Sequence, residues 1–193
     1  HLYLRYWLMG AVAKIWDNHP NYLLVLHGQQ CLGKSYFVRW LGNVLPAYFA
    51  QSPISLQGRD KYIDLTTRFI WEISEIEPGK KKACDQEFQA TTLEELITSV
   101  LIRLRLPYER EHQMYPATAS LVMTQNGVGF PVSRSMLICR LTEVDWHYAT
   151  EMNPHQVWAQ AVAAYGQLRQ TASTHQLAPL LELQQKINRA YER

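Results

Sequence analysis

Residues 28–35, Gly-Gln-Gln-Cys-Leu-Gly-Lys-Ser, have the residue types and spacing of a phosphate-binding loop. The apolar run from Tyr22 to Leu26 predicts a buried strand before this segment, and a helix is expected to start at Lys34. In such a loop, successive backbone N–H groups face the phosphates, which requires glycine where a side chain would block their approach. The pattern therefore predicts a nucleotide site that comprises Gly28, Gln29, Gln30, Cys31, Leu32, Gly33, Lys34 and Ser35.

Two side chains at the end of this segment are expected to act directly on the nucleotide. Lys34 provides a cation for the β- and γ-phosphates, and Ser35 offers a hydroxyl to Mg²⁺. The N-terminus of the following helix also favours negative charge. We therefore expect Lys34 to be catalytic and Ser35 to bind metal, with ATP and Mg²⁺ as the cofactors.

A second chemical element lies in residues 68–77, Arg-Phe-Ile-Trp-Glu-Ile-Ser-Glu-Ile-Glu. Its apolar start predicts a central parallel strand, and carboxylates in such a strand are costly to bury unless they serve a metal or a proton. We expect Glu72 to bind the Mg²⁺ shell and Glu75 to activate the attacking water. Strand alternation places them on opposite faces, so both act only if the chain bends after Glu72. Exchanged roles, or a solvated position for one of them, remain alternatives.

A third predicted strand, residues 119–126, ends in polar residues. Asn126 is expected to hydrogen-bond the γ-phosphate or the water that attacks it, which makes it a catalytic candidate. Arg134 follows this strand and precedes another, Met136 to Leu141. An arginine here is placed to act as a finger on the nucleotide of a neighbouring subunit. Arg140, at the end of the last strand, is the second candidate for that role.

Two basic segments are candidates for nucleic-acid binding. One is a lysine run after a Pro-Gly turn, and the other precedes Tyr115-Pro116 in what would be a hairpin. Basic side chains bind phosphate backbones and aromatic rings stack on bases, although an ordinary surface loop is the alternative for each segment. The net charge of +2 is too small to indicate nucleic-acid binding by itself. The candidates are Lys80, Lys81, Lys82, Arg105, Tyr108, Arg110 and His112.

The elements that must position these residues indicate a P-loop NTPase of the α/β class, with a central, mostly parallel sheet flanked by helices. With 193 residues, 47% of them hydrophobic, the chain predicts a single globular domain. We expect an N-terminal helix in 1–20, an ATPase core in 21–150 and helices in 151–193. We also expect a strand at 53–56, a short helix at 60–66, and a helix that starts at a capping box at Thr92 and runs through Leu104. A long helix from Pro154 and a last helix at 179–191 should complete the chain.

Composition and termini set the remaining expectations. Cys31, Cys84 and Cys139 are far apart and lack metal-ligand spacing, which is typical of reduced thiols in a cytoplasmic protein. No apolar run reaches membrane-spanning length, so we expect no membrane partner. The chain begins with His1 rather than Met, which indicates a fragment of a longer protein.

With these residues assembled, the chain resembles the virulence-associated protein E family, phage- and plasmid-type P-loop ATPases related to superfamily 3 helicases. The similar segments are Tyr6–Val12 for the opening helix, 28–35 for Walker A, Glu72–Glu75 for the acidic motif, Arg105–Tyr108 for the loop, Thr124-x-Asn126 for the sensor and Val157–Gly166 for the closing helix. In two places the chain departs from the family pattern. Arg134 is followed by Ser135 rather than by a second arginine, and Ala117 stands where an arginine is common.

The resemblance implies an AAA+ or superfamily 3 helicase-like fold and a Mg-ATP-dependent DNA motor of mobile-element replication. It also implies a homo-oligomeric ring, with a hexamer as one option, acting on single-stranded or forked DNA with a primase domain or partner. A regulatory or partner-loading ATPase that does not unwind duplex is the alternative. A small-molecule phosphotransferase is a further rival, but no acceptor site or Arg-rich lid is evident in the sequence.

Overall fold

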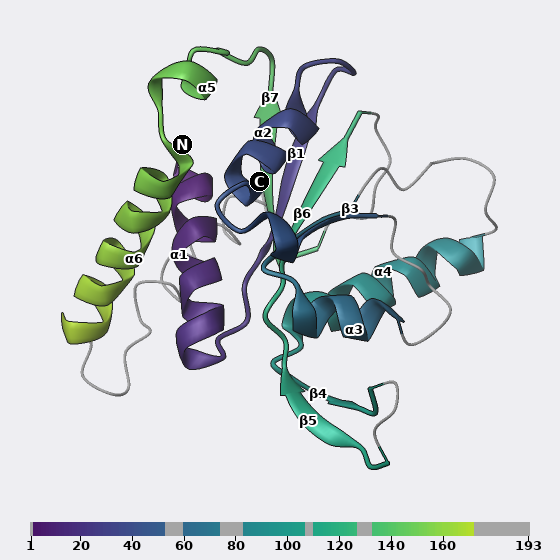
Figure 1. The fold of residues 1–193 in the computed structure, drawn as a ribbon. Helices are drawn as coiled ribbons and strands as arrows, with labels where there is room; N and C mark the ends of the chain where they lie inside the picture. The colour runs from purple at the N-terminus through teal and green to yellow at the C-terminus, as the bar shows by residue number, and fades with distance from the viewer. Residues whose placement is uncertain (1, 53–59, 74–82, 107–109, 127–132, 172–193) are drawn as a thin grey trace.

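A five-stranded parallel sheet forms the centre of the molecule, with helices on both of its faces (Figure 1). The computed structural model describes residues 2–52, 60–73, 83–106, 110–126 and 133–171. In spatial order, the strands are β2 (Phe49–Gln51), β3 (Ile70–Ile73), β6 (Ser120–Gln125), β1 (Leu23–Gly28) and β7 (Met136–Leu141). The predicted α/β class and parallel sheet are confirmed.

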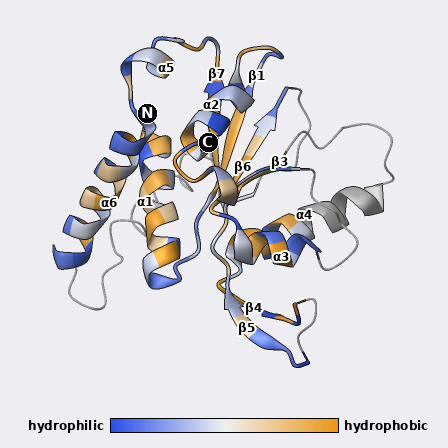
Figure 2. Cartoon of the chain, viewed as in Figure 1, coloured by the Kyte–Doolittle hydropathy of each residue, from blue (hydrophilic) through white to orange (hydrophobic). Residues whose placement is uncertain are grey.

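Strand alternation divides the interior into two hydrophobic layers. Leu24, Ile70 and Val122 belong to the layer shared with α1 (Leu2–Asp17), α2 (Lys34–Gly42) and α6 (Pro154–Thr171). Val25 and Ile73 belong to the opposite layer, shared with α3 (Asp60–Thr67) and α4 (Ala83–Thr98). Because strand β1 is buried on both faces, it is hydrophobic along most of its length (Figure 2).

All five strands run in the same direction, so their carboxyl ends lie together at one end of the sheet and their amino ends at the other. We call these two ends the carboxyl edge and the amino edge. The carboxyl edge contains the ends of β1, β3, β6 and β7, and the Gly28–Ser35 loop connects β1 to α2 there. In open α/β sheets ligands bind outside this edge, where the chain leaves neighbouring strands in different directions. The fold therefore places the glycine loop at the edge where such sheets bind ligands.

The amino edge carries a separate antiparallel hairpin of β4 (Leu101–Leu104) and β5 (Gln113–Pro116) (Figure 1). Its position follows from the chain, since β5 leads directly into the start of β6, where the Ser120 N–H donates to the Phe69 carbonyl (2.8 Å). The hairpin interpretation of this basic segment is thus confirmed for its described strands.

The predicted helix from Thr92 through Leu104 is wrong at both ends. Helix α4 begins before Thr92 and ends at Thr98, and residues 101–104 form β4. The reason is the spacing of the apolar residues: Ile102 and Leu104 are buried while Leu101 is exposed, an alternation that fits a strand paired with β5.

The remaining elements agree in part with the sequence. The first helix ends at Asp17, the short helix begins at Asp60 and the long helix begins at Pro154, as predicted. Strand β2, a 3₁₀ turn at Pro46–Tyr48 and α5 (Tyr148–Glu151) were not predicted. The strand predicted at 53–56 and the helix predicted at 179–191 lie outside the described residues. Within the described part of the chain, no helix has both the length and the hydrophobicity that crossing a bilayer requires.

Candidate functional site

The Gly28–Ser35 loop requires glycine at two positions, for two different reasons. A Cβ at Gly28 would lie 2.5 Å from the Leu141 carbonyl oxygen on the neighbouring strand. Gly33 has a φ of +84°, a left-handed conformation that side chains disfavour, and a Cβ there would lie 2.2 Å from the ring of Trp146. The two glycines therefore allow the loop backbone to pack closely against Leu141 and Trp146.

Lys34 is folded into this loop. Its side chain is only 5% exposed, and Nζ donates to the carbonyl oxygens of Gly28 (2.9 Å) and Gln29 (2.6 Å). The backbone thus wraps around the ammonium group and holds a positive charge inside the loop. Together with the N-terminal end of α2, this charge favours an anion in the concave part of the loop.

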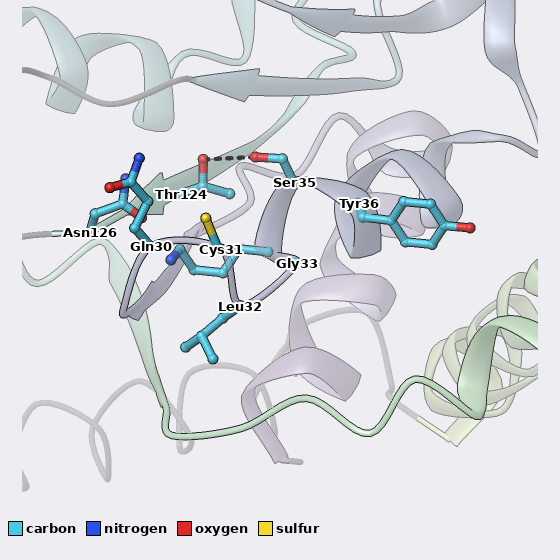
Figure 3. A pocket seen from close by; sticks show the side chains of 9 residues that line it. Gln30, Cys31, Leu32, Gly33, Ser35, Tyr36, Thr124 and Asn126 are labelled. Atoms are coloured by element: carbon cyan, nitrogen blue, oxygen red, sulfur yellow. Dashed lines mark hydrogen bonds between the residues drawn. The ribbon is translucent and has the colours of Figure 1, made fainter.

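A hydrogen-bonded chain connects the loop to two strands of the sheet. The Ser35 hydroxyl donates to Thr124 Oγ1 (3.4 Å), which in turn donates to Glu72 Oε1 (3.1 Å) (Figure 3, which draws the first of these bonds). Glu72 and Thr124 can meet because β3 and β6 are neighbours and both side chains lie on the face that α2 covers. Three residues far apart in sequence therefore form one polar cluster beneath the loop.

The carboxylate of Glu72 is fully buried, and its second oxygen, Oε2, has no hydrogen-bond partner among the described residues. Burial raises the pKa of Glu72 above its usual value, against the opposing effects of the hydrogen bonds from Ser35 and Thr124 and of the positive charge of Arg39. A buried carboxylate oxygen without a partner is energetically costly. A cation or a hydrogen-bond donor beside Oε2 would complete the cluster.

The donor atoms of this cluster fit Mg²⁺. They are hydroxyl and carboxylate oxygens, and Mg²⁺ binds through oxygen, commonly with one or two protein ligands beside phosphates and water. Among the described residues, no group of three or more His, Cys, Asp or Glu side chains could hold a metal ion. Glu72 and Ser35, the two residues expected to bind the metal, nevertheless lie in one cluster and offer the oxygen ligands that Mg²⁺ prefers.

A cavity of about 360 Å³ opens above the loop, which is within the usual size range of small-ligand pockets. Most of the loop and Asn126, all of them candidate site residues, contribute to its wall. Thr124 and Tyr36 also line it, and neither had been given a role of its own. In Figure 3, Thr124 and Asn126 lie on one side of the loop, and Tyr36 points away from them. The lining residues are Gln30, Cys31, Leu32, Gly33, Lys34, Ser35, Tyr36, Thr124 and Asn126.

A family model of the virulence-associated protein E-like domain matches residues 1–192. The chain belongs to this family. The predicted resemblance to it is confirmed over nearly the whole chain, including the loop and the strands that carry Glu72 and Thr124.

Two solved apo structures of the NrS-1 C-terminal region are similar to this virulence-associated E-like domain, with TM-scores of 0.57 and 0.56 and 12% sequence identity each. The matches cover 85% and 84% of this chain but only 40% of each NrS-1 chain, so the domain spans about two fifths of the structures it matches. At this identity the likeness shows a shared fold. A comparison with curated proteins gave no match.

The two finger candidates of the domain lie at opposite edges of the sheet. Arg134 is exposed just before β7, and the next residue, Ser135, accepts a hydrogen bond from the N–H of Leu23 at the start of β1 (3.0 Å). Since β1 extends six residues from there to the loop, Arg134 lies roughly 17 Å along the strand from the loop of its own chain. Arg140 is exposed and pairs in register with His27, directly before the loop.

Only some of the other predicted residues lie in the described part of the chain. Arg105, Arg110 and His112 are exposed where the strands of the β4–β5 hairpin end, so the fold gathers them at the amino edge. Glu75, Lys80, Lys81, Lys82 and Tyr108 lie outside the described residues, and their roles stay predictions. The sequence missed the individual role of Thr124, although a polar residue that ends a buried strand was an available signal. It gave no signal for Trp146.

Proposed function

We propose that this domain hydrolyses Mg-ATP and couples the hydrolysis to movement along DNA during replication of a mobile element. The observation that carries the proposal is the hydrogen-bonded chain from Ser35 through Thr124 to Glu72, which lies beside the Lys34 ammonium in the glycine loop. A buried, incomplete carboxylate next to a phosphate-sized concave loop is the arrangement expected of a nucleotide and its cation. Family membership supports the replication context.

Each residue of the site has a task that follows from its position. Lys34 places its charge at the β- and γ-phosphates, and the loop N–H groups orient the phosphate chain. Ser35 and Glu72 would hold Mg²⁺, which when bound neutralises charge on the phosphates. Thr124 donates to Glu72 and accepts from Ser35, so it keeps both oxygens pointed at one place. Asn126, on the cavity wall, orients the γ-phosphate or the attacking water.

Water activation is assigned to Glu75, with Glu72 as the alternative. Glu72 is already engaged by Thr124 and lies beside Ser35, which suits a metal-binding role better than that of a free base. Glu72 would therefore bind the cation, and Glu75 would take the proton from water.

The amino edge supplies the proposed contacts to other molecules. Exposed basic side chains on the hairpin fit a phosphate backbone, and the distance of Arg134 from its own loop fits a finger that reaches a neighbouring subunit. In that arrangement subunits of a ring bind nucleotide between them. Arg140 is the alternative finger, and because it lies beside the loop of its own chain it would act within the same subunit.

Phosphate release with and without single-stranded DNA, combined with strand displacement on a forked duplex, tests this function. A DNA motor releases phosphate faster on DNA and separates the strands. DNA-stimulated release without strand separation would support the regulatory or partner-loading alternative. A lack of ATP hydrolysis under both conditions would contradict the proposal.

A further inference from the structure

A group of aromatic side chains lies against the glycine loop, beside the residues that would hold the phosphates and the cation. The ring of Trp146, in the segment that leads into α5, lies 5.5 Å from that of Tyr36 and 6.5 Å from that of Tyr148 between centroids. Tyr148 is in turn held edge-on against Phe37 (5.4 Å) and Trp40 (5.0 Å) of α2. We call Tyr36 and Trp146 the aromatic shelf, with Tyr148 as its support.

The shelf is continuous with the loop. A Cβ added at Gly33 would meet the Trp146 ring at 2.2 Å, so this indole lies directly against the loop backbone. Tyr36 follows Ser35 and lines the same cavity as the loop. A ligand in this cavity therefore lies beside the Tyr36 ring, and Trp146 continues the same aromatic surface along the loop backbone.

The two rings of the shelf are open to solvent, unlike most large aromatic side chains. Trp146 is 49% exposed and Tyr36 is 52% exposed, although each packs against other rings. Exposed apolar surface beside a cavity commonly marks a binding site. Aromatic faces of this kind stack on planar ligands, among them nucleobases.

The positions of the polar and aromatic residues around the loop indicate which part of a nucleotide would reach the shelf. Glu72, Thr124 and Asn126 define one end, where the cation and the terminal phosphate belong. Tyr36 points to the opposite side of the loop from Thr124 and Asn126 (Figure 3). A nucleotide with its last phosphate at Thr124 would extend its base towards Tyr36, whose ring lies beside that of Trp146.

We propose that Tyr36 and Trp146 form the base-binding part of the nucleotide site, where the base stacks on the aromatic shelf. The inference rests on the proposed nucleotide function and adds the element that holds the base. Stacking acts on the π face that every base possesses, so it provides affinity without hydrogen-bond recognition of one base.

The test separates base binding from phosphate binding with two ligands. Calorimetric titration with Mg²⁺ and a non-hydrolysable ATP analogue is compared with titration by Mg²⁺ and inorganic tripolyphosphate, which has no base. Trp146→Leu should weaken binding of the analogue about 10-fold and leave tripolyphosphate unchanged, because a stacked base contributes that order of affinity. Tyr36→Leu should act in the same direction, and Trp146→Phe should restore most of the loss.

Trp16→Leu is the matched control, since Trp16 is 46% exposed and contacts Tyr165 on α6, away from the loop. It should change neither affinity. Equal weakening of both ligands by Trp146→Leu would overturn the inference, because Trp146 would then only support the loop at Gly33. Unchanged binding of both ligands would overturn it as well. A wild-type protein that binds tripolyphosphate but gains nothing from the base refutes the shelf alone, whereas one that binds neither ligand refutes the proposed function itself.

Discussion

The polar side chains at the two edges of the sheet differ in burial and in hydrogen bonding. At the carboxyl edge, Ser35, Thr124 and Glu72 are buried or half-buried and bonded to one another within the chain. At the amino edge, Arg105 and Arg110 are exposed on a hairpin. We propose that the first arrangement binds a small ligand and that the second binds another macromolecule. Changes at the two edges should then have separable effects.

The largest expected effect comes from removing the charge inside the loop. Lys34→Ala should lower ATP turnover by about 10²- to 10³-fold or more, because it removes the charge that stabilises the transferring phosphoryl group. The fold should survive, since the hydrogen bonds that Lys34 Nζ donates to the Gly28 and Gln29 carbonyl oxygens join residues of the same loop. Phosphate release and circular dichroism provide the measurements. Turnover near the wild-type value would remove the basis for the site.

The next effect distinguishes the two acids. Glu75→Gln should leave ATP binding intact and slow hydrolysis by about 10²-fold, as expected for loss of a general base. Glu72→Gln should instead weaken the dependence of ATP binding on Mg²⁺. The two variants are matched in size and charge, so each serves as the control for the other. If Glu72→Gln alone slows hydrolysis with unchanged Mg²⁺ dependence, the roles are exchanged.

A smaller effect is expected at the amino edge. Arg105→Ala and Arg110→Ala should each weaken binding to single-stranded DNA severalfold and reduce the salt dependence of log affinity by about 0.7, the amount for one lost phosphate contact. Fluorescence anisotropy at several salt concentrations measures both quantities. Hydrolysis without DNA should not change. Arg5→Ala removes the same charge from an exposed position on α1 and is the control. Equal losses in Arg5→Ala would show a general charge effect rather than a binding hairpin.

The sequence predicted the carboxyl edge better than the amino edge for physical reasons. The loop is contiguous in sequence, so its glycines and Lys34 could be recognised from a local motif. Glu72 stood out because it interrupts an apolar strand, where burying a carboxylate is costly unless it has a partner. Thr124 became meaningful only through its contact with Glu72, across two neighbouring strands. Trp146 reaches Gly33 through the tertiary fold, and no local pattern encodes that contact. The false helix through Leu104 arose because hairpin pairing, rather than local propensity, determines the structure of those residues.

The last prediction concerns stability rather than activity, and a buried charge that lies in neither the loop nor the hairpin. Lys14 is 2% exposed, and burial lowers its pKa from 10.5 to about 8. The unfolded chain binds more protons between these values, so the stability of the fold should rise as the pH increases from about 8 to 10.5. Lys14→Met should abolish this rise and add a few kcal/mol to the unfolding free energy at pH 7. Urea unfolding at pH 7 and pH 10 measures it, and a less stable variant would refute the interpretation. ATP turnover should be unaffected.

Calorimetric titration of the wild-type chain with ATP, in the presence and absence of Mg²⁺, tests most directly whether the carboxyl edge is a nucleotide site. We expect a single ATP to bind per chain with Mg²⁺. Binding should weaken markedly when the cation is removed, because the Glu72 carboxylate is then left uncompensated beside the phosphates. Lys34→Ala should show no comparable binding. An absence of binding by the wild-type chain, or equal affinity with and without Mg²⁺, would contradict the assignment of this loop and carboxylate to Mg-ATP.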